Sequence, residues 1–140
     1  MFKKFLFAFG LCFLSFNVSA SPEYDACYKQ AKNDDGVALC MRAETARILP
    51  IIQEIYLNLS KDPQTRGWNN GNGLINGNLK DMYDHWLAYR NRYCDLYVVA
   101  SQEMFGSESF HREKCLLELT NDHYALIHAA IINANTGPED

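Results

Sequence analysis

Large apolar residues recur every three or four positions along most of this chain, with polar residues between them. This is the period of an α-helix with one buried side, and we find no convincing strand, repeat or second domain. The pattern predicts a helix at about 21–32, a second from within 33–36 to about 59, and two more at about 79–103 and 107–132. We therefore expect an all-α fold: a small bundle of about four helices, two of them long and antiparallel.

Local signals support these helices. Ser21, Pro22 and Glu23 supply a capping hydroxyl, a proline at the first helical position and an acid in the first turn. The apolar stripe of the second helix consists of Val37, Met41, Ile48, Ile51, Ile52, Ile55 and Leu59. The stripe of the third consists of Leu79, Met82, Trp86, Arg90, Tyr93, Tyr97 and Ala100. Pro50 lies inside the second helix, where we expect a kink.

Residues 61–78 interrupt the helical pattern with four glycines and five asparagines. A loop of this length in a compact domain is usually functional or disordered. Its large apolar residues either pack back onto the bundle or contact a partner. The candidate partner-binding residues are Trp68, Asn69, Asn70, Leu74 and Ile75.

The first 20 residues have the features of a secretory signal peptide. Lys3 and Lys4 precede an apolar run at 5–16, and small residues at 18–20 form a cleavage site, so we predict cleavage after Ala20. No later stretch is long enough to cross a bilayer. We expect a periplasmic or secreted protein with a single helical domain at 21–135 and a polar tail at 136–140.

The charge of the exported chain narrows the choice of partners. Loss of Lys3 and Lys4 leaves 11 basic and 17 acidic residues, a formal charge of −6. Such a surface is poorly suited to nucleic acid. A cationic protein or the cationic end of a ligand suits it better, although the same charge also serves solubility alone.

Four cysteines remain after cleavage: Cys27, Cys40, Cys94 and Cys115. An even count in an exported chain predicts two disulfides, for which three connectivities are possible. We favour Cys27–Cys40 and Cys94–Cys115, because each pair brackets a short break between helices. Each bridge would then join a helical hairpin and contribute about 3 kcal/mol in the loop-entropy model.

Two charged residues lie within the apolar stripes. Glu44 falls between Met41 and Ile48 in the second helix, and Arg90 falls in the third. Because a lone buried charge is costly, we predict a structural ion pair between Glu44 and Arg90 that links the two helices.

The sequence shows no catalytic motif. His123 lies among apolar residues and is read as a core histidine, whereas Tyr89, and with it Tyr83, is a candidate for an outward-facing binding surface. His111 and Cys115 have the spacing of two metal ligands on a helix, but no second pair lies nearby, so we expect no metal and no cofactor. An acid/base enzyme using the histidines is the least favoured interpretation.

Several of these residues together resemble the lysozyme inhibitor LprI family. The resembling positions are Cys27, Cys40, Glu44, Tyr56, Leu59, Trp86, Arg90, Cys94, the run 115–120, His123 and Leu126. The chain departs from the family pattern at Tyr83, where glutamine is common, and at His123, where arginine is common. The resemblance implies a small exported helical domain and, for some members, inhibition of host lysozyme.

These observations give one leading hypothesis of function and two others. The leading one is an exported, non-catalytic protein-binding domain of LprI-like type, whose partner is a cationic lysozyme. The alternative is a non-catalytic envelope accessory or toxin-immunity protein. The third is an uncharacterised periplasmic enzyme. The sequence does not indicate an oligomeric state.

Overall fold

The described part of the chain is four α-helices. A computed structural model describes residues 20–61, 79–101 and 106–135. Its helices are α1 (Pro22–Gln30), α2 (Asp34–Lys61), α4 (Leu79–Ala100) and α5 (Glu108–Asn135). No strand occurs within these ranges. The predicted all-α bundle is confirmed.

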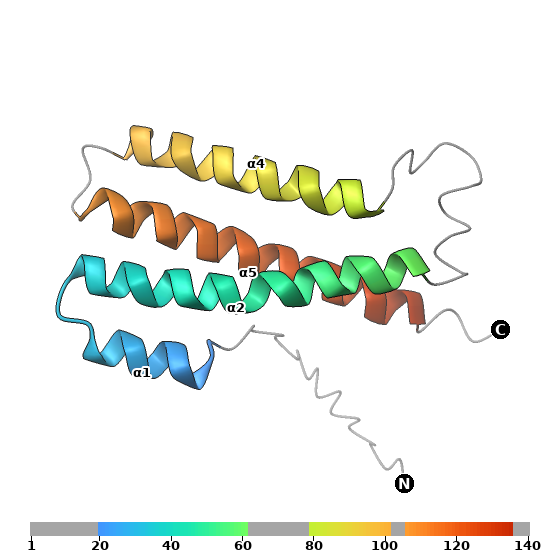
Figure 1. Cartoon of the computed structure of the whole chain (residues 1–140), viewed down its shortest axis with the longest axis horizontal. Helices are drawn as coiled ribbons and strands as arrows, with labels where there is room; N and C mark the ends of the chain where they lie inside the picture. The colour runs from blue at the N-terminus through green and yellow to red at the C-terminus, as the bar shows by residue number, and fades with distance from the viewer. Residues whose placement is uncertain (1–19, 62–78, 102–105, 136–140) are drawn as a thin grey trace, which may run out of the picture.

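The helices lie roughly along one axis (Figure 1). α4 runs antiparallel to α2 and α5, whereas α2 and α5 run in the same direction. α1 is short, antiparallel to α2, and packs mainly against it. α2 and α5 form the largest helix–helix contact, so the central layer of the bundle is a parallel pair with α4 along one edge.

The ends of α1 and the start of α2 follow the local signals in the sequence. Ser21 caps α1, since its hydroxyl accepts a hydrogen bond from the Tyr24 N–H over 3.1 Å. The Ala31 N–H closes the last turn of α1 on the carbonyl of Cys27. The Asn33 side chain then accepts from the Gly36 N–H over 2.9 Å at the start of α2. Two short polar interactions thus fix the turn between the first two helices.

Both predicted disulfides are present. The Cα atoms of Cys27 and Cys40 are 5.7 Å apart, and those of Cys94 and Cys115 are 5.6 Å apart. These separations are typical of disulfides. The first bridge joins α1 to α2 and the second joins α4 to α5, so each closes a hairpin of sequential helices.

The core lies between α2, α4 and α5. Its largest cluster consists of Met41, Ile48, Ile52, Tyr56, Leu79, Tyr83 and Leu117. Four residues assigned to the apolar stripes are instead exposed, namely Ile51, Met82, Tyr93 and Ala100. Tyr83, suggested as outward-facing, is buried. On α4 the inward direction is set by Cys94, which is fully buried in its disulfide, and Tyr93 is turned about 100° away from it.

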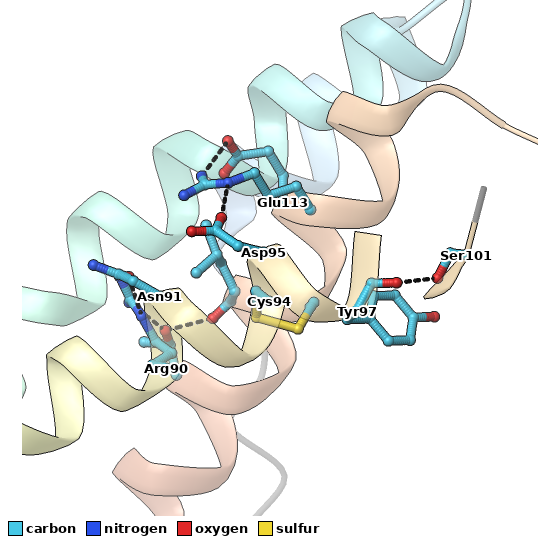
Figure 2. Close-up of a disulfide and its surroundings, with 11 residues drawn as sticks. Arg90, Asn91, Cys94, Asp95, Tyr97, Ser101 and Glu113 are labelled. Carbon is cyan, nitrogen blue, oxygen red and sulfur yellow. Dashed lines mark hydrogen bonds and ion pairs between the residues drawn. A yellow bond between two sulfur atoms is a disulfide. The ribbon is translucent and has the colours of Figure 1, made fainter. Parts of the chain in front are cut away.

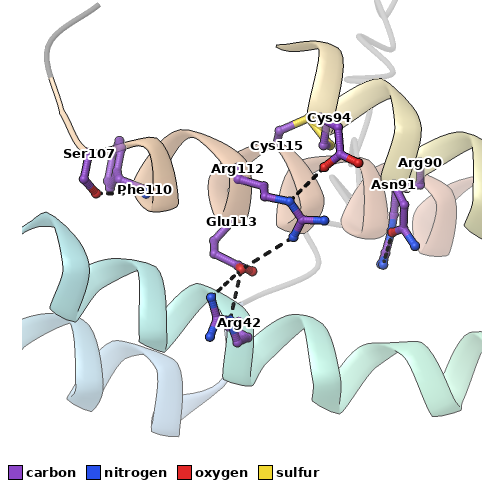
Figure 3. A network of polar contacts seen from close by, with 10 residues as sticks. Arg42, Arg90, Asn91, Cys94, Ser107, Phe110, Arg112, Glu113 and Cys115 are labelled. Atoms are coloured by element: carbon purple, nitrogen blue, oxygen red, sulfur yellow. Dashed lines mark hydrogen bonds and ion pairs between the residues drawn. A yellow bond between two sulfur atoms is a disulfide. The ribbon is translucent and has the colours of Figure 1, made fainter. Parts of the chain in front are cut away.

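A polar network crosses the three large helices near the second disulfide (Figure 3). The buried Glu113 carboxylate on α5 accepts a hydrogen bond from Arg42 Nε on α2 over 3.0 Å. Arg112 Nη1 lies 3.9 Å from the same carboxylate oxygen, and Arg112 Nε donates to Asp95 on α4 over 2.9 Å. The network therefore holds α2, α5 and α4 together at one level.

Among the described helices, none is both long and apolar enough for a membrane span.

Candidate functional site

The side of α4 that faces away from the bundle carries several large apolar residues. Four large residues on it are strongly exposed: Tyr89 (59%), Tyr93 (44%), Leu96 (66%) and Val99 (62%). Their spacing of three and four residues places them along one side of the helix. α4 lies at the edge of the bundle, so no described helix covers this side (Figure 1). We call this surface, together with His85, Ala88 and Arg92, the α4 outer face.

The α4 outer face contains a shallow hollow of about 480 Å³. Its lining residues are His85, Ala88, Tyr89, Arg92, Tyr93 and Leu96. The rings of Tyr89 and Tyr93 are 5.8 Å apart, centre to centre, and tilted by 35°. Tyrosine and arginine are the residue types that most often dominate binding energy at protein interfaces. The hollow therefore has the composition of a protein-contact surface.

The opposite side of α4 holds the helix in place. Tyr83 is buried in the main core, and Trp86 packs against that core. Cys94 is bonded to Cys115 on α5. Tyr83, Trp86 and Cys94 thus attach α4 to the bundle through this inner side.

Arg90 is buried on the inner side of α4, but its partners differ from the predicted one. Its Nη1 donates to the Thr120 hydroxyl on α5 over 2.9 Å, and its Nη2 donates to Asn91 Oδ1 over 2.8 Å. The guanidinium carbon lies 5.5 Å from the centre of the Trp86 ring, within cation–π range. Figure 2 shows Arg90 and Asn91 next to the Cys94 disulfide. Burial lowers the pKa of Arg90.

Glu44 is buried at a different place, between α2 and the start of α1. Arg47 donates to both of its carboxylate oxygens, over 2.7 Å and 3.0 Å. The hydroxyl of Ser21 donates over 2.6 Å and its backbone N–H over 3.2 Å. The bonds from Arg47, and then those from Ser21, outweigh the effect of burial and lower the pKa of Glu44 to about 2.

The predicted ion pair between Glu44 and Arg90 is therefore wrong, although both side chains are buried. The physical reason is the arrangement of the helices. Glu44 is turned toward α1, where a local arginine and a helix cap satisfy its carboxylate. Arg90 is turned toward α5, where the Thr120 hydroxyl accepts from it, while Asn91 and the Trp86 ring on its own helix receive the rest of its charge.

His123 lies in a stack of aromatic rings. Its ring centre is 4.0 Å from that of Trp86 at an interplanar angle of 12°, and 5.8 Å from that of Tyr56 at 10°. The Tyr56 hydroxyl and His123 Nε2 are 3.0 Å apart and share a hydrogen bond. Burial lowers the pKa of His123 and raises that of Tyr56, so both rings are held neutral near pH 7. The stack joins all three large helices and agrees with the core position expected for His123.

A second hollow, of about 270 Å³, lies beside this stack. It is lined by Pro50, Gln53, Glu54, Tyr56, Leu57, Ser60 and Tyr83. His123 is behind Tyr56 and is not part of the lining.

The sequence identified part of the α4 outer face. Tyr89, one of the two candidates for an outward-facing surface, is exposed. Leu96, Val99 and Arg92 were not singled out, although the spacing of Tyr89, Tyr93 and Leu96 is itself a helical stripe. The predicted stripe of this helix places Tyr93 in the core and so does not separate the outer row from the inner one. The loop candidates Trp68, Asn69, Asn70, Leu74 and Ile75 lie outside the described residues.

No protein-family model matches the chain, and neither the curated proteins nor the solved structures give a match. The resemblance to the LprI family therefore rests on the residues quoted above.

Proposed function

We propose that this chain is an exported, non-catalytic protein-binding domain, and that it binds its partner through the α4 outer face. The observation that carries the proposal is the exposed row of Tyr89, Tyr93, Leu96 and Val99 on the outside of the edge helix. A contiguous apolar surface that the fold does not use favours a contact with another macromolecule. Two disulfides in so small a chain support an oxidising, non-cytoplasmic environment.

The partner we propose is a cationic lysozyme, in the manner of an LprI-type inhibitor. The whole chain carries a formal charge of −4, and the segment after the proposed leader carries more negative charge. Asp81 and Asp84 are exposed in the first turns of α4, next to the apolar row. Such charges speed the approach of a cationic protein, while the tyrosines and Leu96 supply the apolar contact.

Inhibition of bacterial cell-wall lysis by hen and human lysozyme tests this proposal. The exported protein is added in micromolar excess, and the inhibition constant is compared among three variants. Leu96→Asp is expected to weaken inhibition at least about tenfold, as loss of an interface residue worth about 1.4 kcal/mol would. Leu126→Asp is the matched control, because Leu126 is 67% exposed on α5 and Leu96 is 66% exposed on α4.

The third variant, Trp68→Ala, separates the loop candidate from the helix face. We expect inhibition to survive this change. If Trp68→Ala abolished inhibition and Leu96→Asp did not, the binding face would be the loop and not α4. Undiminished lysis with the unaltered protein would overturn the lysozyme proposal for these targets.

A second candidate function is supported by the cation in the middle of the α4 outer face. Arg92 lines the hollow between Tyr89 and Leu96, which favours a partner surface that carries an acidic group there. A toxin-immunity or envelope accessory protein would fit such a contact. This candidate predicts that Arg92→Glu weakens partner binding, whereas a purely cationic partner would bind the Arg92→Glu variant more tightly.

A further inference from the structure

Ser21, at the start of the folded region, is joined to α2 by two hydrogen bonds. Its backbone N–H donates to Glu44 Oε1 over 3.2 Å, and its hydroxyl donates to Glu44 Oε2 over 2.6 Å. Ser21 is buried, whereas Ala20 before it is exposed. The backbone nitrogen that faces this buried carboxylate therefore belongs to the peptide bond that the sequence pattern marks for cleavage.

The position of Ser21 does not depend on the residue before it. Its hydroxyl oxygen accepts from the Tyr24 N–H while donating to Glu44, and its carbonyl accepts from the Asp25 N–H over 3.0 Å. These contacts are made by atoms of Ser21 on the far side of the Ala20–Ser21 bond. Cleavage of that bond would leave them intact and the nitrogen in place.

We propose that hydrolysis of the Ala20–Ser21 peptide bond creates an α-ammonium group that the Glu44 carboxylate binds, so that leader removal adds an ion pair between α1 and α2. The inference rests on the export part of the proposed function. A leader-peptidase enzyme and one water carry out the step. The bond between the Ala20 carbonyl carbon and the Ser21 nitrogen breaks, the water oxygen ends in the Ala20 carboxylate, and the nitrogen takes up the two protons that water brought.

The charges around Ser21 favour a cation at this nitrogen. A positive group at the start of a helix is opposed by the helix dipole, so it needs nearby acids. Glu44 is ionised and directly bonded to Ser21, and Glu23 and Asp25 lie in the first turn of α1. Among the described residues, the charged or titratable groups around this corner also include Tyr24, Tyr28, Arg47, Lys114, Glu118 and Tyr124. Arg47 shares the carboxylate of Glu44, and the first-turn acids offset its charge.

The first test is the mass of the exported protein. The full chain is produced in a bacterial host with its own leader and purified from the periplasm. Intact mass should correspond to a chain that begins at Ser21. A chain that begins at any other residue would overturn the inference. Lysozyme binding is measured separately on the same sample, so that failure of the inference and failure of the proposed function can be told apart.

The second test places the ammonium one residue away. The matched control is a chain with one glycine inserted after Ala20. After processing, the glycine carries the ammonium group and Ser21 keeps an amide N–H. At pH 6 the unaltered chain should unfold at a higher urea concentration than the inserted chain. A cation stabilised by folding has a raised pKa, so this advantage should be lost as pH rises above the ordinary value of about 8 for an α-amine.

Glu44→Gln identifies the acceptor. In this background the glycine insertion should no longer change the urea midpoint at pH 6, because the carboxylate is gone. If Glu44→Gln does not accumulate as folded protein, the test of the ion pair is the difference in urea midpoint between the unaltered and the inserted chain, measured as a function of pH. Equal midpoints of the unaltered and inserted chains at every pH would contradict the ion pair.

Discussion

Arg90 on α4 and Thr120 on α5 form a hydrogen bond of 2.9 Å inside the bundle, where a carboxylate had been expected. The Thr120 hydroxyl is fully buried, accepts from the guanidinium, and donates to the Leu116 carbonyl over 2.6 Å. One small side chain thus connects the charge of Arg90 to the backbone of α5. The carbonyl group polarises the hydroxyl and makes it a better acceptor for the cation.

Thr120→Val should destabilise the protein by about 1–3 kcal/mol, because a buried guanidinium N–H loses its acceptor. Thr45→Val is the matched control. Thr45 is equally internal on α2, but its hydroxyl has no hydrogen-bond partner among the described residues. The control should change the free energy of unfolding by less than about 0.5 kcal/mol or raise it. Urea unfolding of both variants measures the difference, and equal losses would contradict a special role for Thr120.

The helices and disulfides could be predicted from the sequence because their signals are local. The cap at Ser21, the turn at Asn33 and the cysteines that bracket each break all act within a few residues or one hairpin. The face of a helix is harder to predict, since an error of one residue rotates it by about 100°. Cys94 had to point inward to reach Cys115, and that requirement alone would have turned Tyr93 outward.

The partners of the buried charges could not be predicted, because periodicity does not say which helix lies opposite. Glu44 and Arg90 each occur in an apolar stripe, but they face different neighbours. The antiparallel α4–α5 hairpin, joined by the Cys94–Cys115 disulfide, brings Thr120 to the level of Arg90, whereas Glu44 lies beside α1. Such long-range placement depends on the whole topology of the bundle, which the helix pattern alone leaves open.

Removing the second disulfide should destabilise the protein without changing its helix content at room temperature. Cys94→Ser combined with Cys115→Ser opens a loop of 21 residues, which costs about 3 kcal/mol in the loop-entropy model. Opening the bridge of 13 residues with Cys27→Ser and Cys40→Ser should cost a similar amount. Circular dichroism during urea unfolding measures both losses.

Thiol labelling checks the bridges independently of stability. The unaltered exported protein should show no thiol reaction at Cys27, Cys40, Cys94 or Cys115 under denaturing, non-reducing conditions. Labelling of all four cysteines would contradict the disulfides, whatever the stability of the variants.

The stack of His123 with Trp86 should make the protein less stable in mild acid. Burial lowers the pKa of His123, so the folded state binds a proton less readily than the unfolded chain, whose histidine titrates near 6.5. The contribution of the neutral imidazole is present above pH 6.5 and is lost as pH falls below it. Urea unfolding from pH 8 to pH 5 should show this loss, and His123→Gln should reduce it.

His85→Gln controls for the removal of an imidazole, because His85 is exposed on α4. This variant should keep the pH dependence of the unaltered protein. A slope that disappears in His85→Gln and persists in His123→Gln would assign the effect to the wrong histidine and contradict the argument from burial.

Glu44 should determine stability in stronger acid. The hydrogen bonds from Arg47 and Ser21 lower its pKa to about 2, whereas an unfolded chain protonates glutamate near 4.5. The stabilising effect of the carboxylate is therefore present above about pH 4.5 and is lost as pH falls toward 2. The difference in urea midpoint between the unaltered protein and Glu44→Gln should shrink over this range. A constant difference would mean that Glu44 acts through its shape and its neutral hydrogen bonds, not through its charge.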